Sequence, residues 1–149
     1  MRDGRVEVIP VAGAVRILPS MVGIGDDGAL LVGQPARNQY AAHPERTVRS
    51  IKRRMGESAR VAMAGKDYAP QEISAMILRH LKSRAEAHLG VAVNKAVITV
   101  PAFFSDVQRQ ATREAGEIAG QRTLTPDFLS INSIRHIAAI SGYFLDILA

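Results

Sequence analysis

The pattern of apolar and polar positions between residues 95 and 101 predicts a buried strand. Residues 96–100 read Ala-Val-Ile-Thr-Val and are apolar on both faces of an extended chain, as is typical of a central strand covered on two sides. Pro101 follows, and it has no backbone N–H to donate to a neighbouring strand. The strand is therefore expected to end at this proline.

A helix is predicted directly after this strand. Ser105 and Gln108 form a capping-box pattern, and Asp106 suits the positive end of a helix. Gly120 is a natural helix stop. The apolar residues between these signals recur at helical spacing and are expected to face a core; they are Val107, Ala111, Ala115, Ile118 and Ala119.

The first 68 residues read as short elements. Residues 5–32 predict a β-meander, with a hairpin turn signal at residues 26–28. Residues 35–56 predict two short helices, with Pro35 and Pro44 in their first turns and a stop at Gly56. Residues 57–68 read as a polar connector or hairpin that turns at Gly65.

A longer helix is predicted from Pro70 to Leu89, ended by Gly90. One face of this helix carries a stripe of apolar residues, which is expected to pack on the meander of residues 5–32. Arg79 is expected on the opposite face. The stripe consists of Ile73, Met76, Ile77, Leu81, Ala85 and Leu89. His80 and His88 lie on or near it, and without a carboxylate or a third histidine at ligand spacing they are interpreted as surface or boundary residues rather than metal ligands.

Composition narrows the function classes. The chain has 149 residues, about one domain, and no cysteine, so it can form neither a disulfide nor a thiolate metal site. Its net charge is +5, and basic residues cluster over residues 46–54. No aromatic platform accompanies this cluster, so a solvated helix face is favoured over a nucleic-acid site. No signal peptide is recognised, and the late apolar stretch 137–149 contains Asp146 and is too short to cross a bilayer, so no membrane association is expected.

Three blocks of the chain resemble the DnaK-type, or seventy-kilodalton heat-shock, chaperones. ITVPAFFSDVQRQATREAGEIAG (residues 98–120) resembles the strand-and-helix signature of their actin-like ATPase domain. The stretches LPSMVGIGDDGALLVGQPARNQYAAHPERTVRSIKRRMG (residues 18–56) and APQEISAMILRHLKSRAEAHLG (residues 69–90) resemble two further blocks of that domain, in the same order. Together the resemblance covers about residues 4–121.

The resemblance implies an α/β fold, a fragment of an actin-like (ribonuclease-H-like) ATPase domain. Residues 1–93 are expected to form an upper-lobe-like part, and residues 94–121 a partial base lobe of one strand and one helix. Residues 122–149 form a divergent tail, in which the family's Asn-Glu-Pro-Thr segment is not found and residues 136–145 read as an amphipathic helix. The tail is either a divergent ending or the product of a frameshift or insertion. The base strand is expected to lack its sheet neighbours and to expose an apolar edge open to self-association.

The resemblance also implies three site residues. Lys52 matches the family's catalytic lysine, whose ammonium lies near the γ-phosphate of ATP. Pro101 matches a proline that switches conformation between nucleotide states, and Arg109 matches the arginine that couples this switch to the substrate-binding domain. Each residue also has a plain structural interpretation, as a surface lysine, a strand-ending proline and an exposed helix arginine. No metal ligand is identified, and the residues that would bind a cofactor are unknown.

The function implied is that of an ATP-dependent, cytoplasmic chaperone of the stress response that uses ATP and Mg²⁺, with unfolded polypeptides and co-chaperones as partners. The family's Asp-Leu-Gly-Thr-Thr phosphate loop is not found in the chain, and its glycines at 23, 25, 28 and 33 are not at a strand-to-helix crossover. We therefore expect the chain to bind nucleotide poorly and to be inactive alone. The alternative is a non-catalytic fragment, or an interaction module that binds another chaperone subunit.

Overall fold

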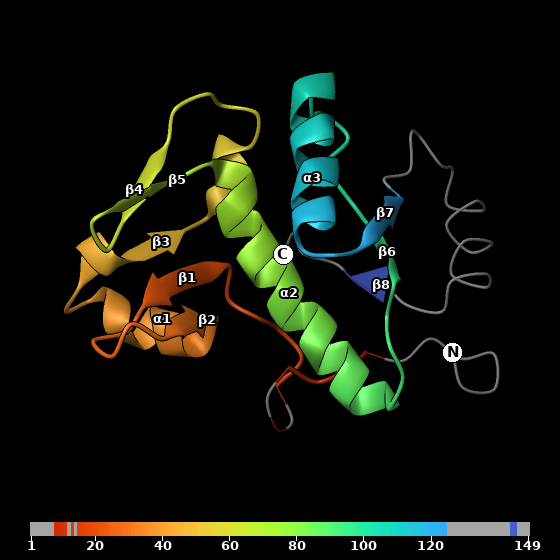
Figure 1. Ribbon diagram of the computed structural model, residues 1–149, viewed down its shortest axis with the longest axis horizontal. Helices are drawn as coiled ribbons and strands as arrows, with labels where there is room; N and C mark the ends of the chain where they lie inside the picture. Colours follow the sequence, from red (N-terminus) through yellow and green to blue (C-terminus); the bar gives the residue numbers. More distant parts are fainter. Residues whose placement is uncertain (1–7, 12, 14, 125–143, 146–149) are drawn as a thin grey trace.

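The computed structural model describes residues 8–11, 13, 15–124 and 144–145. Figure 1 shows a long helix, α2 (Pro70–Leu89), between two groups of elements. On one side lie the short strands and helix of residues 21–68, and on the other lie helix α3 (Asp106–Ile118) and a second sheet. Both α2 and α3 are where the sequence predicts helices.

The first sheet has three antiparallel strands in the order β2-β1-β3. Its strands are β1 (Met21–Ile24), β2 (Leu30–Val32) and β3 (Thr47–Arg49). The turn predicted at residues 26–28 joins β1 to β2, with Ile24 opposite Leu30. Helix α1 (Gln34–Tyr40) begins with Pro35 in its first turn, and strands β4 (Val61–Met63) and β5 (Lys66–Tyr68) form the hairpin predicted around Gly65.

The prediction of a second helix within residues 35–56 is wrong. The chain instead forms a 3-10 turn (Pro44–Arg46), strand β3, and a second 3-10 turn (Ile51–Arg54). Val48 lies opposite Val22 of β1, so the segment gains a sheet partner that a helix would forgo. Ser50 lies between β3 and the second turn with a φ of 53°, a left-handed conformation that breaks helical continuity.

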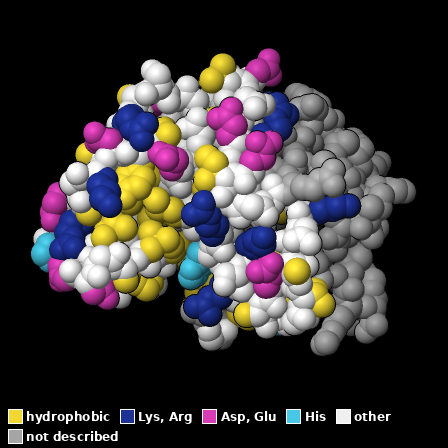
Figure 2. Space-filling view, in the orientation of Figure 1, with side chains coloured by type: hydrophobic (Ala, Val, Ile, Leu, Met, Phe, Trp, Pro, Cys, Tyr) yellow, Lys and Arg dark blue, Asp and Glu magenta, His cyan; other side chains and the backbone are white. Residues whose placement is uncertain are grey.

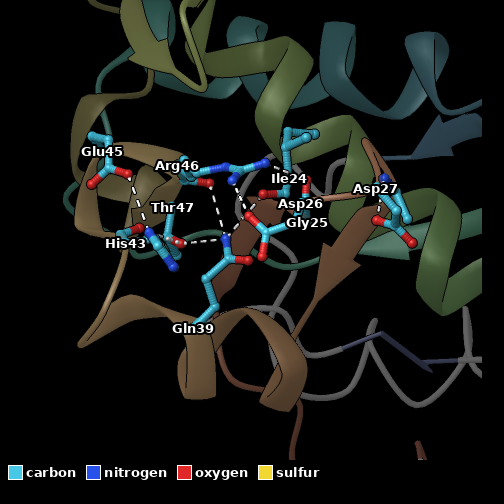
Figure 3. A network of polar contacts seen from close by, with 10 residues as sticks. Ile24, Gly25, Asp26, Asp27, Gln39, His43, Glu45, Arg46 and Thr47 are labelled. Atoms are coloured by element: carbon cyan, nitrogen blue, oxygen red, sulfur yellow. Dashed lines mark hydrogen bonds and ion pairs between the residues drawn. The ribbon is translucent and has the colours of Figure 1, made fainter.

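A network of polar contacts joins α1 to the first sheet (Figure 3). The Gln39 Nε2 donates to the carbonyl oxygen of Ile24 at 3.2 Å and to Thr47 Oγ1 at 3.0 Å. Arg46 pairs with Asp26 and also donates to the carbonyl oxygen of Gly25. These bonds fix β1, β3 and α1 relative to one another, and the amide reaches the sheet only because Gly23 has no side chain: a Cβ there would lie 2.8 Å from Gln39 Nε2.

The long helix α2 has two buried faces and contributes to two cores. Ile73 and Ile77 pack in the first core with Val22, so the helix docks on the described part of the meander, as predicted. Ala75 and Leu78 pack in a second core, whose other members are Met55, Ile98, Phe104, Ala111, Ala115 and Ala119. Complete burial of a large aliphatic side chain contributes roughly 1.5–3 kcal/mol. One helix therefore stabilises both groups of elements.

Strand β6 (Lys95–Ile98) is paired on both sides, so the expected loss of its sheet neighbours is wrong. It forms parallel pairs with β7 (Arg122–Leu124) and with β8 (Phe144–Leu145). Three consecutive side chains of β6, Ala96, Val97 and Ile98, are buried, as a strand covered on both faces requires. The chain itself thus covers the apolar strand that was expected to expose an edge.

Other expectations need correction. Residues 144–145 form β8 rather than the end of a helix, and the rest of the helix predicted over residues 136–145 lies outside the described residues. Val107 and Ile118 are 63% and 41% exposed, because α3 packs on α2 through its small residues Ala111 and Ala115 instead. Apolar side chains gather at the surface over the first sheet (Figure 2). Leu30, in strand β2, is 47% exposed.

Candidate functional site

Lys52 lies in the 3-10 turn Ile51–Arg54, between two buried anchors. Ile51 packs in the first core and Met55 in the second, so both ends of the turn are fixed. The Arg53 N–H donates to the carbonyl oxygen of Ser50 at 3.1 Å, which closes the turn. As a result Lys52 is partly buried, whereas Arg53 is exposed. The local fold therefore distinguishes two adjacent cations and turns Lys52 toward the protein.

A cavity of about 40 Å³ lies beside Lys52, where the two cores meet. Thr99 and Val100, at the carboxyl end of β6, line it together with Phe104. The structure therefore brings Lys52 to the end of the strand that precedes Pro101. The lining residues from the other elements are Ser20, Ile51, Met55, Ser74, Ile77, Leu78, Ile98, Thr112 and Ala115.

Arg109 holds the turn that follows Pro101. Its Nε donates to the carbonyl oxygen of Phe104 at 3.1 Å, and its Nη2 donates to that of Ala102 at 3.1 Å. Within the turn, the Phe104 N–H donates to the carbonyl oxygen of Pro101 at 3.0 Å. A planar guanidinium suits such a pair of acceptors because its donors are fixed in a fork. Pro101 and Arg109, singled out separately in the sequence, belong to one hydrogen-bonded unit.

The two aromatic residues of this turn have opposite surroundings. Phe104 is buried in the second core with Met55, whereas Phe103 is 85% exposed. Their rings meet edge to face with centroids 5.9 Å apart. Phe104 is the residue common to both parts of the site, since it lines the cavity beside Lys52 and its backbone carbonyl oxygen accepts from Arg109.

Sequence reasoning missed Phe104, Ser20 and Ser74 as neighbours of Lys52. The sequence held one unused indication for Phe104: it is a large apolar residue directly before the polar residues Ser105 and Asp106. Ser20 and Ser74 gave none, because they come from the segment before β1 and from the middle of α2. Only the packing of α2 between the two cores brings them to the same cavity.

His80 and His88 both lie in helix α2. Within the described part of the chain, no group of three or more His, Cys, Asp or Glu residues is placed to hold a metal ion. Burial lowers the pKa of His80, and the nearby Arg84 cation lowers it further. His88 is exposed. The expectation that both are surface or boundary residues agrees with these positions.

Comparison of the sequence with known proteins identifies a family. The profile of the family described as Hsp70 protein matches residues 1–63 and 57–125. The chain is 57% identical over 122 residues to the chaperone protein DnaK of Thermotoga neapolitana, 56% to that of Thermotoga maritima and 55% to that of Thermosipho africanus. Each match covers 82% of this chain and 20% of the relative, so the chain spans about a fifth of the length of these relatives.

Among the described residues, no helix is long and apolar enough to cross a membrane. The mixed α/β fold, with its small antiparallel sheets, is that of a part of the actin-like ATPase fold of the matched family. The two profile matches together cover more than half of the sequence. This chain belongs to the Hsp70 family of chaperones.

Proposed function

We propose that this chain supplies part of the ATPase machinery of a DnaK-type chaperone, with Lys52 as its catalytic cation. The observation that carries the proposal is the position of Lys52, partly buried at the carboxyl end of β6 and separated from the Pro101 turn by the cavity that Phe104 also lines. Carboxyl ends of strands are where ligands bind in many α/β folds. A lysine held there suits a phosphate group.

ATP bound with Mg²⁺ would supply the phosphoryl group that such a domain hydrolyses. Lys52 would contribute charge stabilisation at the γ-phosphate, because a positioned ammonium opposes the charge that develops in the transition state. For Mg²⁺, the described residues offer no cluster of three potential ligands. The contribution proposed for the described part of the chain is therefore the Lys52 cation.

Pro101 and Arg109 are proposed to transmit the state of that site. The two hydrogen bonds from Arg109 to the carbonyl oxygens of Ala102 and Phe104 make the turn and the start of α3 move as a unit. A displacement of Pro101 would then be passed to α3. The partners proposed to receive this change are the substrate-binding part of a DnaK-type protein, its polypeptide clients and co-chaperones, in the cytoplasm and during the stress response.

By itself the 149-residue chain is proposed to hydrolyse ATP negligibly. Loss of one preorganised electrostatic contact typically costs about a hundredfold or more in rate. Lys52 cannot replace the contacts that the family's phosphate loop would make, and that loop is not found in this sequence. Calorimetry with ATP and Mg²⁺, followed by a steady-state ATPase assay, tests this. The control is Arg53→Ala, which removes the exposed cation next to Lys52. Sustained hydrolysis that disappears in Lys52→Ala but persists in Arg53→Ala would show a working active site and overturn the proposal that the chain alone is inactive.

The calorimetric titration with ATP and Mg²⁺ also tests the alternative, a non-catalytic module that binds another chaperone subunit. Weak but saturable binding of Mg²⁺-ATP, weakened by Lys52→Ala and not by Arg53→Ala, supports the ATPase origin of the site. Complete lack of binding by the folded chain supports the interaction module instead.

A further inference from the structure

We infer that Gly56 is a positioning residue that ties the Lys52 turn to the first turn of α3. The inference rests on the role proposed above for Lys52 and extends it to the contact by which the turn meets the helix. Gly56 lies two residues after the 3-10 turn Ile51–Arg54 and has a φ of 80°. Glycine adopts this left-handed conformation without the steric cost that a side chain would add. The chain therefore bends sharply at Gly56, directly after the Lys52 turn.

The backbone of Gly56 approaches α3 very closely. A Cβ at this position would lie 3.1 Å from Val107 Cγ1 and 3.3 Å from both Cγ and the backbone N of Gln108. The Val107 side chain is exposed, whereas the Gln108 N–H is held in place because it donates to Ser105 Oγ in the capping box. A side chain at position 56 would thus press on the fixed first turn of the helix.

Met55 provides a second attachment between the same two segments. Its N–H donates to the carbonyl oxygen of Lys52 at 3.4 Å, and its side chain is buried in the second core with Phe104. Two consecutive residues after the Lys52 turn therefore contact the start of α3 and the residue before its cap, one through its backbone and one through its side chain. Close-packed contacts of this kind have low compressibility and transmit displacements.

The contact at Gly56 links the two halves of the candidate site. Arg109 holds the turn after Pro101 through two backbone carbonyl oxygens, and its neighbour in the chain, Gln108, is the residue that Gly56 approaches. A displacement of the Lys52 turn is then passed to the first turn of α3 without passing through Pro101. The helix receives the state of the site by two routes, of which Gly56 is the second.

Gly56→Ala in the intact 149-residue chain tests this contact, and Gly28→Ala is the matched control. Gly28 has a φ of 79°, and a Cβ there would meet nothing within 4 Å. Both variants carry the strain of a positive φ, so the difference between them isolates the contact with α3. The reporters are the side-chain Nε–H resonance of Arg109 and the backbone N–H resonances of Lys52 and Gln108, observed by ¹⁵N NMR. We expect all three to shift in Gly56→Ala and to stay in place in Gly28→Ala.

Rescue separates this contact from a general loss of structure. Val107→Ala removes the carbon atom nearest to the added Cβ, so in the Gly56→Ala background it should reduce the Arg109 shift. If Gly56→Ala does not fold, Val107→Ile enlarges the exposed partner instead and should shift the Gly56 and Lys52 N–H resonances. Val91→Ile, at an exposed valine outside α3, is its control and should leave them unchanged.

Equal Arg109 shifts in Gly56→Ala and Gly28→Ala, or a shift that Val107→Ala does not reduce, would overturn the inference. These resonances are measured without nucleotide, so a failure of the unmodified chain to bind Mg²⁺-ATP would count against the proposed role of Lys52 and leave this test intact. Where the unmodified chain does bind Mg²⁺-ATP, Gly56→Ala should lower the affinity several-fold and Gly28→Ala should not. An unchanged affinity in Gly56→Ala would show that Gly56 does not position Lys52.

Discussion

The Arg79 guanidinium donates a hydrogen bond of 2.7 Å from Nη2 to the carbonyl oxygen of Ile118. Three residues further along α2, Lys82 Nζ donates to the carbonyl oxygen of Gly120 at 3.0 Å. Carbonyl groups at the end of a helix have no partner within the helix, and the helix dipole places negative charge there. Two cations of α2 therefore cap the C-terminal end of α3. Arg79, which was expected on the face opposite the apolar stripe, makes a structural contact from there.

Removal of this contact should cost stability. Arg79→Ala is expected to lower the free energy of unfolding by about 1 kcal/mol, since the site is exposed and a net hydrogen bond is worth about that much. Arg84→Ala, an exposed arginine on the same helix, is the matched control and should change it by less than about 0.5 kcal/mol. Urea denaturation measures both, and equal values would mean that the contact does not hold α3.

The docking of α2 on the first core can be tested with a buried charge. Ile77→Asp removes an aliphatic side chain that packs with Val22 and Met63 and leaves an unpaired carboxylate in its place. We expect a loss of at least about 2–5 kcal/mol, the usual cost of truncation alone. Ala87→Asp places the same charge at an exposed position of the helix and should be nearly neutral. Chemical denaturation that finds the two variants alike would contradict the packing described.

The close approach of Gln39 to Gly23 predicts a non-additive pair of mutations. Gly23→Ala would place a Cβ 2.8 Å from Gln39 Nε2 and 3.0 Å from Thr47 Oγ1, and overpacking of this kind typically costs about 1–3 kcal/mol. In a Gln39→Ala background part of the clash is gone, so Gly23→Ala should cost less there. A double-mutant cycle measures the difference, and simple additivity would show that the two residues do not interact.

Gln121 offers a way to stabilise the fold. Its side chain is buried, and neither amide atom has a hydrogen-bond partner among the described residues. Each unpaired buried polar group costs about 1–3 kcal/mol. The similarly shaped Gln121→Met should therefore raise the free energy of unfolding by about 1 kcal/mol, whereas Gln110→Met, on the exposed side of α3, should not. A lower melting temperature for Gln121→Met would indicate that the amide is paired.

Stability should depend on pH through His80. Burial, with a smaller contribution from the Arg84 cation, lowers its pKa in the folded state below the usual 6.5. The unfolded chain then binds the proton more readily, so stability is full above about pH 6.5 and falls as the pH drops through the folded-state pKa. His80→Gln should flatten this part of the pH profile. Denaturation curves between pH 7.5 and 5 provide the measurement.

The local sequence determined the helices and their ends. At α3, Ser105 accepts from the Gln108 N–H while the Gln108 side chain accepts from the Ser105 N–H, as the capping box predicts. Helix α2 begins at Pro70 and is ended by Gly90, as expected. These signals act within a few residues of chain, which is why they can be read without any knowledge of the fold. The blocks that resemble the family could be recognised for the same reason.

Only the tertiary structure decided what is paired across long separations. Strand β3 is three residues long and becomes a strand because Val48 lies opposite Val22, 26 positions earlier. The partners of β6 come from residues 122–124 and 144–145, where the sequence pattern indicated a divergent tail. The hydrogen bonds that hold Arg109 against the turn after Pro101 end on two backbone carbonyl groups, which every sequence contains and none reveals. Sheet pairing, helix capping from a neighbouring helix and the cavity beside Lys52 all depend on which surfaces meet, and the chemistry of single positions does not encode that.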